Sequence, residues 1–240
     1  MTLNTWGNSG PYLERWDFLL EELKIHCPDI LFLQEVFNPT LAQKIKELFS
    51  YQHLLSSYEA GLVLISRFPI FENQTLKYKT VSPYEQQDRQ ALLAGFELKG
   101  KKILTVNTHL AWRTKDKYIR LQQVQELLQS IVSKGYPALL VGDFNDVRGS
   151  SAINEIENAG YVDLCSLLHP GKQIITWDNQ NLFIQTHSVK FPDRQIDFLF
   201  LHKKLIEPNR VKSCEIIFNR PNQNGIYPSD HYGVLAELEI

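Results

Sequence analysis

Asp143 and Asn145 are the residues of this chain whose types and spacing best suit chemistry. They follow the apolar run 138–142, which predicts a buried strand that ends in a polar loop. Because the two residues are two positions apart, an extended backbone would direct both side chains to the same side. A carboxylate and an amide at the mouth of a sheet can together hold a metal ion, a water molecule or a phosphate, whereas burying a carboxylate without such a partner is costly.

Further polar groups stand at the ends of apolar runs, in the same kind of position as Asp143. Each one alone is commonly just a solvated or structural residue, and Asp197 could simply form an ion pair with Arg194. Their repetition along the chain instead indicates that they converge on one rim of two packed sheets. These groups are Asn4, Glu35, His109, Asp197 and the pair Asp230–His231.

Short strands predominate among the elements that must position these groups, and several strands adjoin in the sequence. This order predicts antiparallel sheets with helices outside, not a doubly wound parallel sheet. We expect one domain over residues 1–240, because no repeat or linker interrupts the chain. Helices are predicted over 11–26, 40–49, 115–134 and 150–158. Strands are predicted over 29–35, 62–65, 71–81 (at a sheet edge), 90–98, 102–109, 138–142, 195–201, 211–217 and 232–238.

The composition is that of an ordinary soluble globular protein, with 43% hydrophobic and 22% charged residues. The net charge of −2 creates no overall field that would attract nucleic acid, and the basic residues between Lys99 and Arg120 are expected to form a solvated face. Cys27, Cys165 and Cys214 make neither a disulfide framework nor a zinc pattern, which predicts reduced, buried thiols and a cytoplasmic setting. We find no signal peptide or membrane-length apolar run, and we expect a monomer without a stable protein partner.

Four motifs follow one another along the chain: Leu33-Gln34-Glu35, Asn107-Thr108-His109-Leu110, Gly142-Asp143-Phe144-Asn145 and Ser229-Asp230-His231. Together with the segment 61–70, they resemble the endonuclease/exonuclease/phosphatase superfamily, the deoxyribonuclease-I-like proteins. The resemblance implies a four-layer α/β sandwich of two packed, mixed but largely antiparallel sheets flanked by helices. It also implies a divalent-metal-dependent phosphoester hydrolase.

The metal site that the resemblance implies is built from oxygen ligands. Glu35 would be the primary ligand, helped by Asn4, and Asp230 would complete the shell or hold the loop of His231. Oxygen ligands without cysteine favour Mg²⁺, with Mn²⁺ as the alternative, over zinc. Because only three residues precede Asn4, the first strand is expected either to be very short or to continue upstream.

The resemblance also assigns catalytic roles. Asp143 would orient or deprotonate the attacking water, and Asn145 would steady that water or a phosphate oxygen. His231, paired with Asp197, would be a second acid/base or a phosphate-binding group, because a carboxylate fixes the imidazole and raises its pKa. His109 would donate a hydrogen bond to a phosphoryl oxygen.

Supporting residues are assigned less directly. Arg89 begins a predicted strand, where the family often has an arginine that faces phosphate, but an ordinary ion pair with Asp88 or Glu97 fits the sequence equally well. By the same resemblance, Glu59 would support His109.

Trp112 and Trp177 are the candidates for choosing the substrate, by stacking on a base or covering an apolar tail, although both could simply cap the core. We expect a metal-dependent phosphodiesterase, and the sequence leaves its substrate class open. Glu35 is followed by Val36-Phe37 and not by the Thr-Lys that abasic-site endonucleases usually carry, which counts against that subgroup. The alternatives are a DNA or RNA nuclease, a sphingomyelinase-like phospholipid phosphodiesterase, a phosphatase of a small phosphorylated metabolite, and an inactive binding module.

Overall fold

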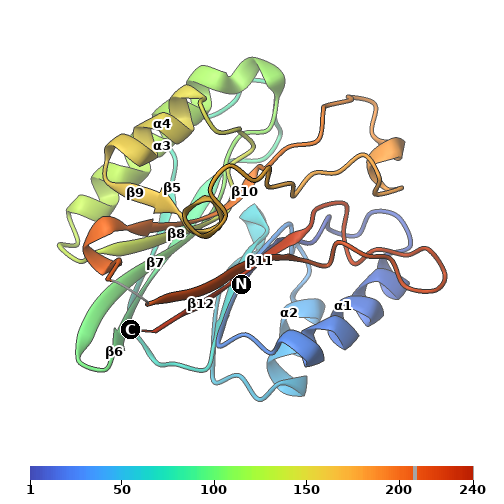
Figure 1. Ribbon diagram of the computed structural model, residues 1–240, viewed down its shortest axis with the longest axis horizontal. Coiled ribbons are helices and arrows are strands. Elements are labelled where there is room, and N and C mark those ends of the chain that lie inside the picture. Colours follow the sequence, from blue (N-terminus) through green and yellow to red (C-terminus); the bar gives the residue numbers. More distant parts are fainter. Residues whose placement is uncertain (208–209, 240) are drawn as a thin grey trace.

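Two six-stranded β-sheets pack face to face, and helices cover both outer faces (Figure 1). This computed structural model describes residues 1–207 and 210–239. Its four layers confirm the predicted α/β sandwich with mixed, mostly antiparallel sheets.

The first sheet joins strands from the two ends of the chain, in the order β11-β12-β1-β2-β4-β3. The pair β1 and β2 is parallel, and the other described pairs of this sheet are antiparallel. Its strands are β1 (Thr2–Asn4), β2 (Ile30–Gln34), β3 (His53–Ser57), β4 (Leu62–Ser66), β11 (Val211–Ile217) and β12 (Gly233–Leu238).

The second sheet comes from the middle of the chain, in the order β5-β6-β7-β8-β10-β9. Here β7 and β8 form the parallel pair, since a helix crosses between them, and the other described pairs are antiparallel. Its strands are β5 (Ile70–Lys77), β6 (Gln90–Leu98), β7 (Lys101–His109), β8 (Ala138–Asp143), β9 (Tyr161–Asp163) and β10 (Asp197–His202).

Helices α1 (Tyr12–His26) and α2 (Pro39–Leu48) pack on the first sheet, and α3 (Lys117–Val132) and α4 (Ser151–Asn158) pack on the second. The side chains of Asn38 and Ser150 accept backbone hydrogen bonds at the starts of α2 and α4, which fixes where these helices begin. A short helix, α5 (Leu164–Leu168), follows β9. No helix in residues 1–207 and 210–239 is long and apolar enough to cross a membrane.

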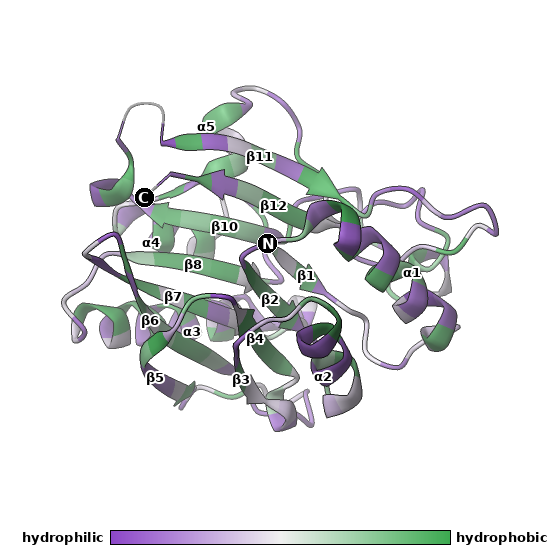
Figure 2. Cartoon of the chain, turned by 90° about the horizontal axis from the view of Figure 1, so that it is seen from below, coloured by the Kyte–Doolittle hydropathy of each residue, from purple (hydrophilic) through white to green (hydrophobic). Residues whose placement is uncertain are grey.

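Three apolar layers hold the sheets and helices together. Hydrophobic residues dominate the strands in Figure 2, whereas the helices carry both kinds of residue, as expected for elements with one solvated face. The middle layer lies between the two sheets and includes Phe32, Phe96 and Val141, all of which are buried. By packing the two sheets against each other, this layer brings strand ends of both sheets close together at one edge of the sandwich. The site described below lies at that edge.

The structure adds elements that the sequence did not predict. The strand β3 was missed because its five residues include two serines, and β9 and α5 were missed because they are very short. Not every large apolar residue of the helices faces the core, since Leu13 of α1 and Val132 of α3 are exposed. The prediction that residues near 71–81 form an edge strand is confirmed, and within the given residues the first strand covers three residues.

The prediction of reduced, buried thiols is wrong. Cys165 of α5 and Cys214 of β11 form a disulfide, and Cys27 is exposed. The two paired cysteines are 49 positions apart, so their spacing gives no signal, and only the packing of α5 against β11 brings them together. The cytoplasmic setting therefore loses the argument from reduced thiols and stays a prediction.

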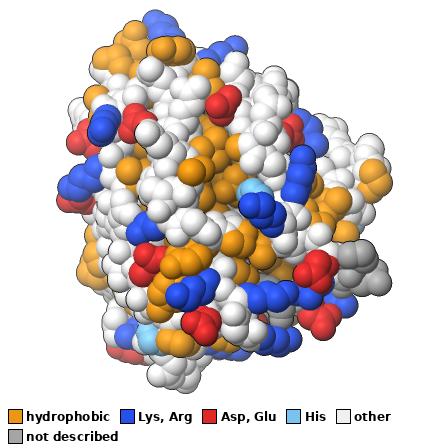
Figure 3. All heavy atoms as spheres, turned by 90° about the vertical axis from the view of Figure 1, so that its left-hand side faces the viewer, with side chains coloured by type: hydrophobic (Ala, Val, Ile, Leu, Met, Phe, Trp, Pro, Cys, Tyr) orange, Lys and Arg blue, Asp and Glu red, His pale blue; other side chains and the backbone are white. Residues whose placement is uncertain are grey.

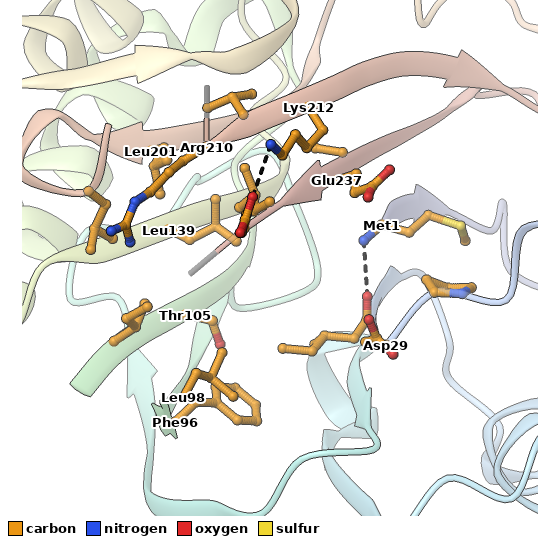
Figure 4. Close-up of a pocket in the computed structure, with 18 of the residues that line it drawn as sticks. Met1, Asp29, Phe96, Leu98, Thr105, Leu139, Leu201, Arg210, Lys212 and Glu237 are labelled. Carbon is orange, nitrogen blue, oxygen red and sulfur yellow. Dashed lines mark hydrogen bonds and ion pairs between the residues drawn. The ribbon is translucent and has the colours of Figure 1, made fainter. Parts of the chain in front are cut away.

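One end of the sandwich is open between the two sheets. Figure 3 shows apolar side chains gathered in a hollow on this side of the molecule, with charged side chains around it. The hollow leads into a cavity of about 1000 Å³, called the far-end cavity here. Phe96, Leu98, Leu139 and Leu201 line it, and Lys212 lies at its border (Figure 4).

Candidate active site

The predicted site residues meet at the end of the sandwich opposite the far-end cavity, because neighbouring strands end there in register. His109 of β7 lies opposite Asp143 of β8, and Asp143 lies opposite Asp197 of β10. In the other sheet, Asn4 ends β1 and Glu35 directly follows the parallel strand β2. The prediction that these residues converge on one rim is confirmed.

Asn4 joins the polar groups of the two sheets. Its Nδ2 donates to Oε1 of Glu35 at 3.1 Å and to Oδ2 of Asp143 at 3.0 Å. Its Oδ1 accepts a hydrogen bond from the backbone N–H of Trp6 at 3.0 Å. Asn4 therefore acts here as a donor between two carboxylates, and the oxygen that could bind a metal is already engaged.

Asp143 lies at the centre of the site and is buried. Its Oδ2 lies 3.3 Å from Nε2 of His109 and 3.9 Å from Nε2 of His231. Its Oδ1 accepts the backbone N–H of Asn145 at 2.8 Å, and Asn145 itself has a left-handed backbone (φ 50°) and donates from Nδ2 to the carbonyl of Leu110. The expectation of an extended backbone from Asp143 to Asn145 is thus wrong, because the chain turns directly after β8.

His231 is held between two carboxylates. Its Nδ1 lies 3.0 Å from Oδ2 of Asp197, which fixes the ring, while its Nε2 faces Asp143. Trp177 packs edge-on against the imidazole with ring centroids 5.1 Å apart. The predicted pairing of His231 with Asp197 is confirmed, and Arg194 stacks on Phe191 instead of binding Asp197.

The charges and the burial at the site shift the pKa values of its two histidines in opposite directions. Burial opposes a charge on His231, but the carboxylates of Asp197, Asp230 and Asp143 outweigh it and raise the His231 pKa well above its usual value. Burial, together with the charges of Arg89 and His231, lowers the pKa of His109 well below its usual value. Burial and the nearby Asp197 raise the pKa of Asp143 to about 7. At neutral pH the site thus holds a cationic His231, a neutral His109 and an Asp143 carboxyl close to the midpoint of its titration.

Glu35 and Asp230 form a second group of carboxylates beside this centre. Burial and the charge of Asp230 raise the pKa of Glu35, although the hydrogen bond from Asn4 and the charges of His231 and Arg89 oppose this shift. One oxygen of Asp230 lies 2.9 Å from Nε2 of His187, and the other accepts a hydrogen bond from the Ser229 hydroxyl. Two crowded carboxylates are the ligand chemistry that a hard divalent cation satisfies.

Asp143, Asp197 and His231 are an alternative set of metal ligands, since one ligand atom from each lies within 4.8 Å of the others. However, Nδ1 of His231 is already bound to Asp197, and the imidazole is drawn toward its cationic form, which cannot bind a metal. Glu35 and Asp230 instead offer carboxylate oxygens alone, the type of ligand that Mg²⁺ and Mn²⁺ prefer.

The predicted substrate residues have different surroundings. Arg89 is buried and pairs with Glu85 at 2.7 Å, not with the two acids suggested by the sequence. Trp177 is buried against the site, whereas Trp112 is 38% exposed. Glu59 does not support His109; it binds Lys77 and the side chain of Gln90.

Two buried side chains that support the site were not predicted as such. The guanidinium of Arg15 donates to backbone carbonyls of residues 5, 7, 9 and 228, which ties the loop after Asn4 to the loop before Asp230. Burial lowers the pKa of Arg15 to about 10. Between the sheets, Gln34 donates to Asn107 at 2.7 Å. Gln34 and Asn107 belong to motifs quoted from the sequence, whereas the position of Arg15 within α1 gave no signal of its role.

A family model for the Endonuclease/Exonuclease/phosphatase family matches residues 1–231. The chain belongs to this family. The motifs and the fold agree with that membership, and the predicted resemblance is confirmed.

Individual relatives of this family member are distant. It is 25% identical over its whole length to tyrosyl-DNA phosphodiesterase 2 of Xenopus laevis. It is 30% identical over 175 residues, 60% of the chain, to the inositol phosphosphingolipids phospholipase C of Schizosaccharomyces pombe. The chain spans 66% of the first protein and 40% of the second, less than two thirds of each. Among solved structures, D. rerio TDP2 in complex with a single-strand DNA product matches with a TM-score of 0.79 at 22% identity, covering 100% of this chain and 97% of that one, which supports the fold.

Proposed function

We propose that this protein is a divalent-metal-dependent phosphodiesterase. The observation that carries the proposal is the placing of buried Asp143, with a pKa of about 7, between the His231–Asp197 pair and the carboxylates at Glu35 and Asp230. A group with this pKa can exchange a proton with water near neutral pH.

Glu35 and Asp230 would hold the metal, and Mg²⁺ or Mn²⁺ suits their oxygens. When bound, the cation would neutralise negative charge on the phosphoryl oxygens. Asn4 keeps the Glu35 carboxylate beside Asp143 through its two hydrogen bonds. The metal charge would offset the burial and the charge of Asp230 that raise the pKa of Glu35.

The remaining residues act on the water and the phosphate. Asp143 orients the attacking water and takes up its proton, and the turn through Asn145 fixes the carboxylate with a backbone hydrogen bond. His231, kept cationic by Asp197, binds a phosphoryl oxygen or protonates the leaving oxygen. Neutral His109 donates a hydrogen bond to the phosphate.

The preference for a diester is supported by a relative that matches over the whole chain and whose name describes a phosphodiesterase. The test compares hydrolysis of bis-nitrophenyl phosphate and mono-nitrophenyl phosphate with Mg²⁺, with Mn²⁺ and with chelator. We expect turnover of the diester that requires metal. No turnover of either compound with any divalent metal, or faster turnover of the monoester, would refute the proposal.

Variants separate the metal site from the proton-transfer groups. His231→Gln should lower kcat by about 10²- to 10⁴-fold while the melting temperature still rises with added Mg²⁺. Glu35→Gln should abolish that rise, because it removes a ligand. Lys101→Gln, an exposed change at the opposite end of β7, is the control for both measurements. A Glu35→Gln protein that responds to Mg²⁺ like the wild type would place the metal elsewhere.

A further inference from the structure

Two loops beside the site are joined by one buried side chain, that of Glu85. Its Oε2 accepts Nε of Arg89 at 2.7 Å, and its Oε1 accepts the backbone N–H groups of Trp112 and Arg113 at 2.6 and 3.4 Å. The Glu85 side chain is only 3% exposed. Glu85 thus fixes the loop that precedes β6 to the loop that follows β7.

The joined loops expose two pairs of a cation and an aromatic ring. The guanidinium of Arg113 lies 3.9 Å from the ring centroid of Trp112, and Nζ of Lys115 lies 5.6 Å from that of Tyr84. Trp112 is 38% exposed and Tyr84 is 54% exposed. We call Tyr84, Trp112, Arg113 and Lys115 the aromatic rim.

The charge of these loops is positive at the surface. Of their acids, Glu85 and Asp116 have buried side chains and Asp88 is exposed, so one solvated carboxylate stands against several exposed cations. Arg113, Lys115 and the adjoining Lys117 are exposed. The protein as a whole has a net charge of −2, so the positive surface is local to this part of the molecule.

The rim adjoins the site. Trp112 is three residues beyond His109, the residue whose Nε2 lies 3.3 Å from Asp143. Arg89, the partner of Glu85, is close enough for its charge to act on both His109 and Glu35. A chain whose phosphate lies at Asp143 can therefore reach the rim with its neighbouring units.

We propose that the aromatic rim binds the single-stranded nucleic acid that flanks the phosphate to be cleaved. This rests on the proposed function and names its substrate class. Rings that are exposed beside cations match a strand in which each unit offers a flat base and a phosphate, since bases stack on Trp, Tyr and Arg and the cations neutralise phosphates.

The same arrangement disfavours a choline lipid. Aromatic rings recognise a quaternary ammonium group through the negative face of the ring. Here Arg113 and Lys115 already lie over the rings of Trp112 and Tyr84, so a choline cation would meet like charge. An anionic ligand meets attraction from the same two residues.

Binding of a fluorescent single-stranded oligonucleotide of about 12 nucleotides, followed by anisotropy in chelator and at several salt concentrations, tests the proposal without any turnover. Trp112→Ala should weaken binding about tenfold, the loss expected for one stacked base. Arg113→Gln and Lys115→Gln should each lower the slope of log affinity against log salt by about 0.7, the value for one lost phosphate contact.

Lys102→Gln is the matched control, because Lys102 also lies over aromatic rings, those of Phe71 and Tyr136, but at the opposite end of β7. It should leave affinity and salt slope unchanged. Equal losses in Lys102→Gln and the rim variants, or no loss in any of them, would overturn the proposal. So would rim-dependent binding to sphingomyelin vesicles without binding to the oligonucleotide.

Glu85 is a positioning residue in this account. Glu85→Ala should weaken oligonucleotide binding as much as Trp112→Ala, and Glu85→Gln should restore most of it because the amide oxygen can still accept the two backbone N–H groups. Thermal melts confirm that each variant is folded, and wild-type binding from a folded Glu85→Ala protein would refute this role. Failure of the wild type to hydrolyse the nitrophenyl esters would refute the proposed function alone, because binding is measured without metal.

Discussion

The two ends of the sandwich are built from the same strands but differ in their polarity and in how they are closed. Strand β7 begins at Lys101 beside the far-end cavity and ends at His109 in the site. At the site end, polar side chains bind one another across the two sheets, as Asn4 binds Asp143. At the far end, apolar side chains surround a cavity of about 1000 Å³.

The two ends also differ in how deeply their ionisable side chains are buried. At the far end the ion pair between Lys101 and Glu207 is half exposed, and such pairs contribute little to stability. At the site end His109 and Asp143 are buried, and their pKa values move in opposite directions. Burial thus shifts the proton affinity of the side chains that end β7 and β8.

The largest expected effect contrasts two glycines, one at each end. Gly142 has a φ of 132°, and a Cβ there would lie 2.0 Å from the carbonyl oxygen of Thr108, so β7 and β8 would have to separate beside Asp143. Gly142→Ala should lower the free energy of unfolding by more than about 4 kcal/mol and abolish diester hydrolysis. Chemical denaturation measures the first effect and nitrophenyl release the second.

Gly100 supplies the control, in the turn between β6 and β7. It also has a positive φ of 77°, but a Cβ there would meet nothing within 4 Å. Gly100→Ala should therefore cost only the backbone strain, about 1 kcal/mol, and leave turnover intact. Equal costs at the two glycines would show that the close approach at Gly142 is not what holds the site.

The sequence was sufficient for the layers of the fold because long strands and helices repeat their apolar residues with a clear period. It was insufficient where an element is short or depends on distant contacts. The strand β3 and the disulfide between Cys165 and Cys214 are of this kind, since only packing between remote segments creates them.

The candidate site was predicted well in position and less well in geometry. Polar residues at strand ends had to converge once the two sheets packed. The left-handed turn at Asn145 and the contact of Asp230 with His187 could not be foreseen, because neither follows from a strand or helix period. Arg15 is hidden for a related reason, because a charged residue on a helix is ordinarily solvated.

A smaller effect is expected from the charge of Asp143. A carboxyl with a pKa of 3.8 in the unfolded chain and about 7 in the folded one binds protons more readily when folded, so its contribution to stability is lost as pH rises from about 4 to 7. In chelator, the wild type should lose on the order of 3 kcal/mol relative to Asp143→Asn between pH 4 and pH 8. Denaturation at a series of pH values measures this difference, and parallel curves for the two proteins would contradict it.

The smallest effect is expected at the far end. Lys101→Gln removes an ion pair whose side chains are 44% and 49% exposed, and Glu207 keeps Arg210 as a partner. The free energy of unfolding should change by less than about 1 kcal/mol, with the small change vanishing at high salt, and kcat for the diester should stay the same. A tenfold loss of turnover in this variant would mean that β7 transmits changes from one end of the sandwich to the other. The chemistry would then depend on the whole strand and not on the burial of its last residue.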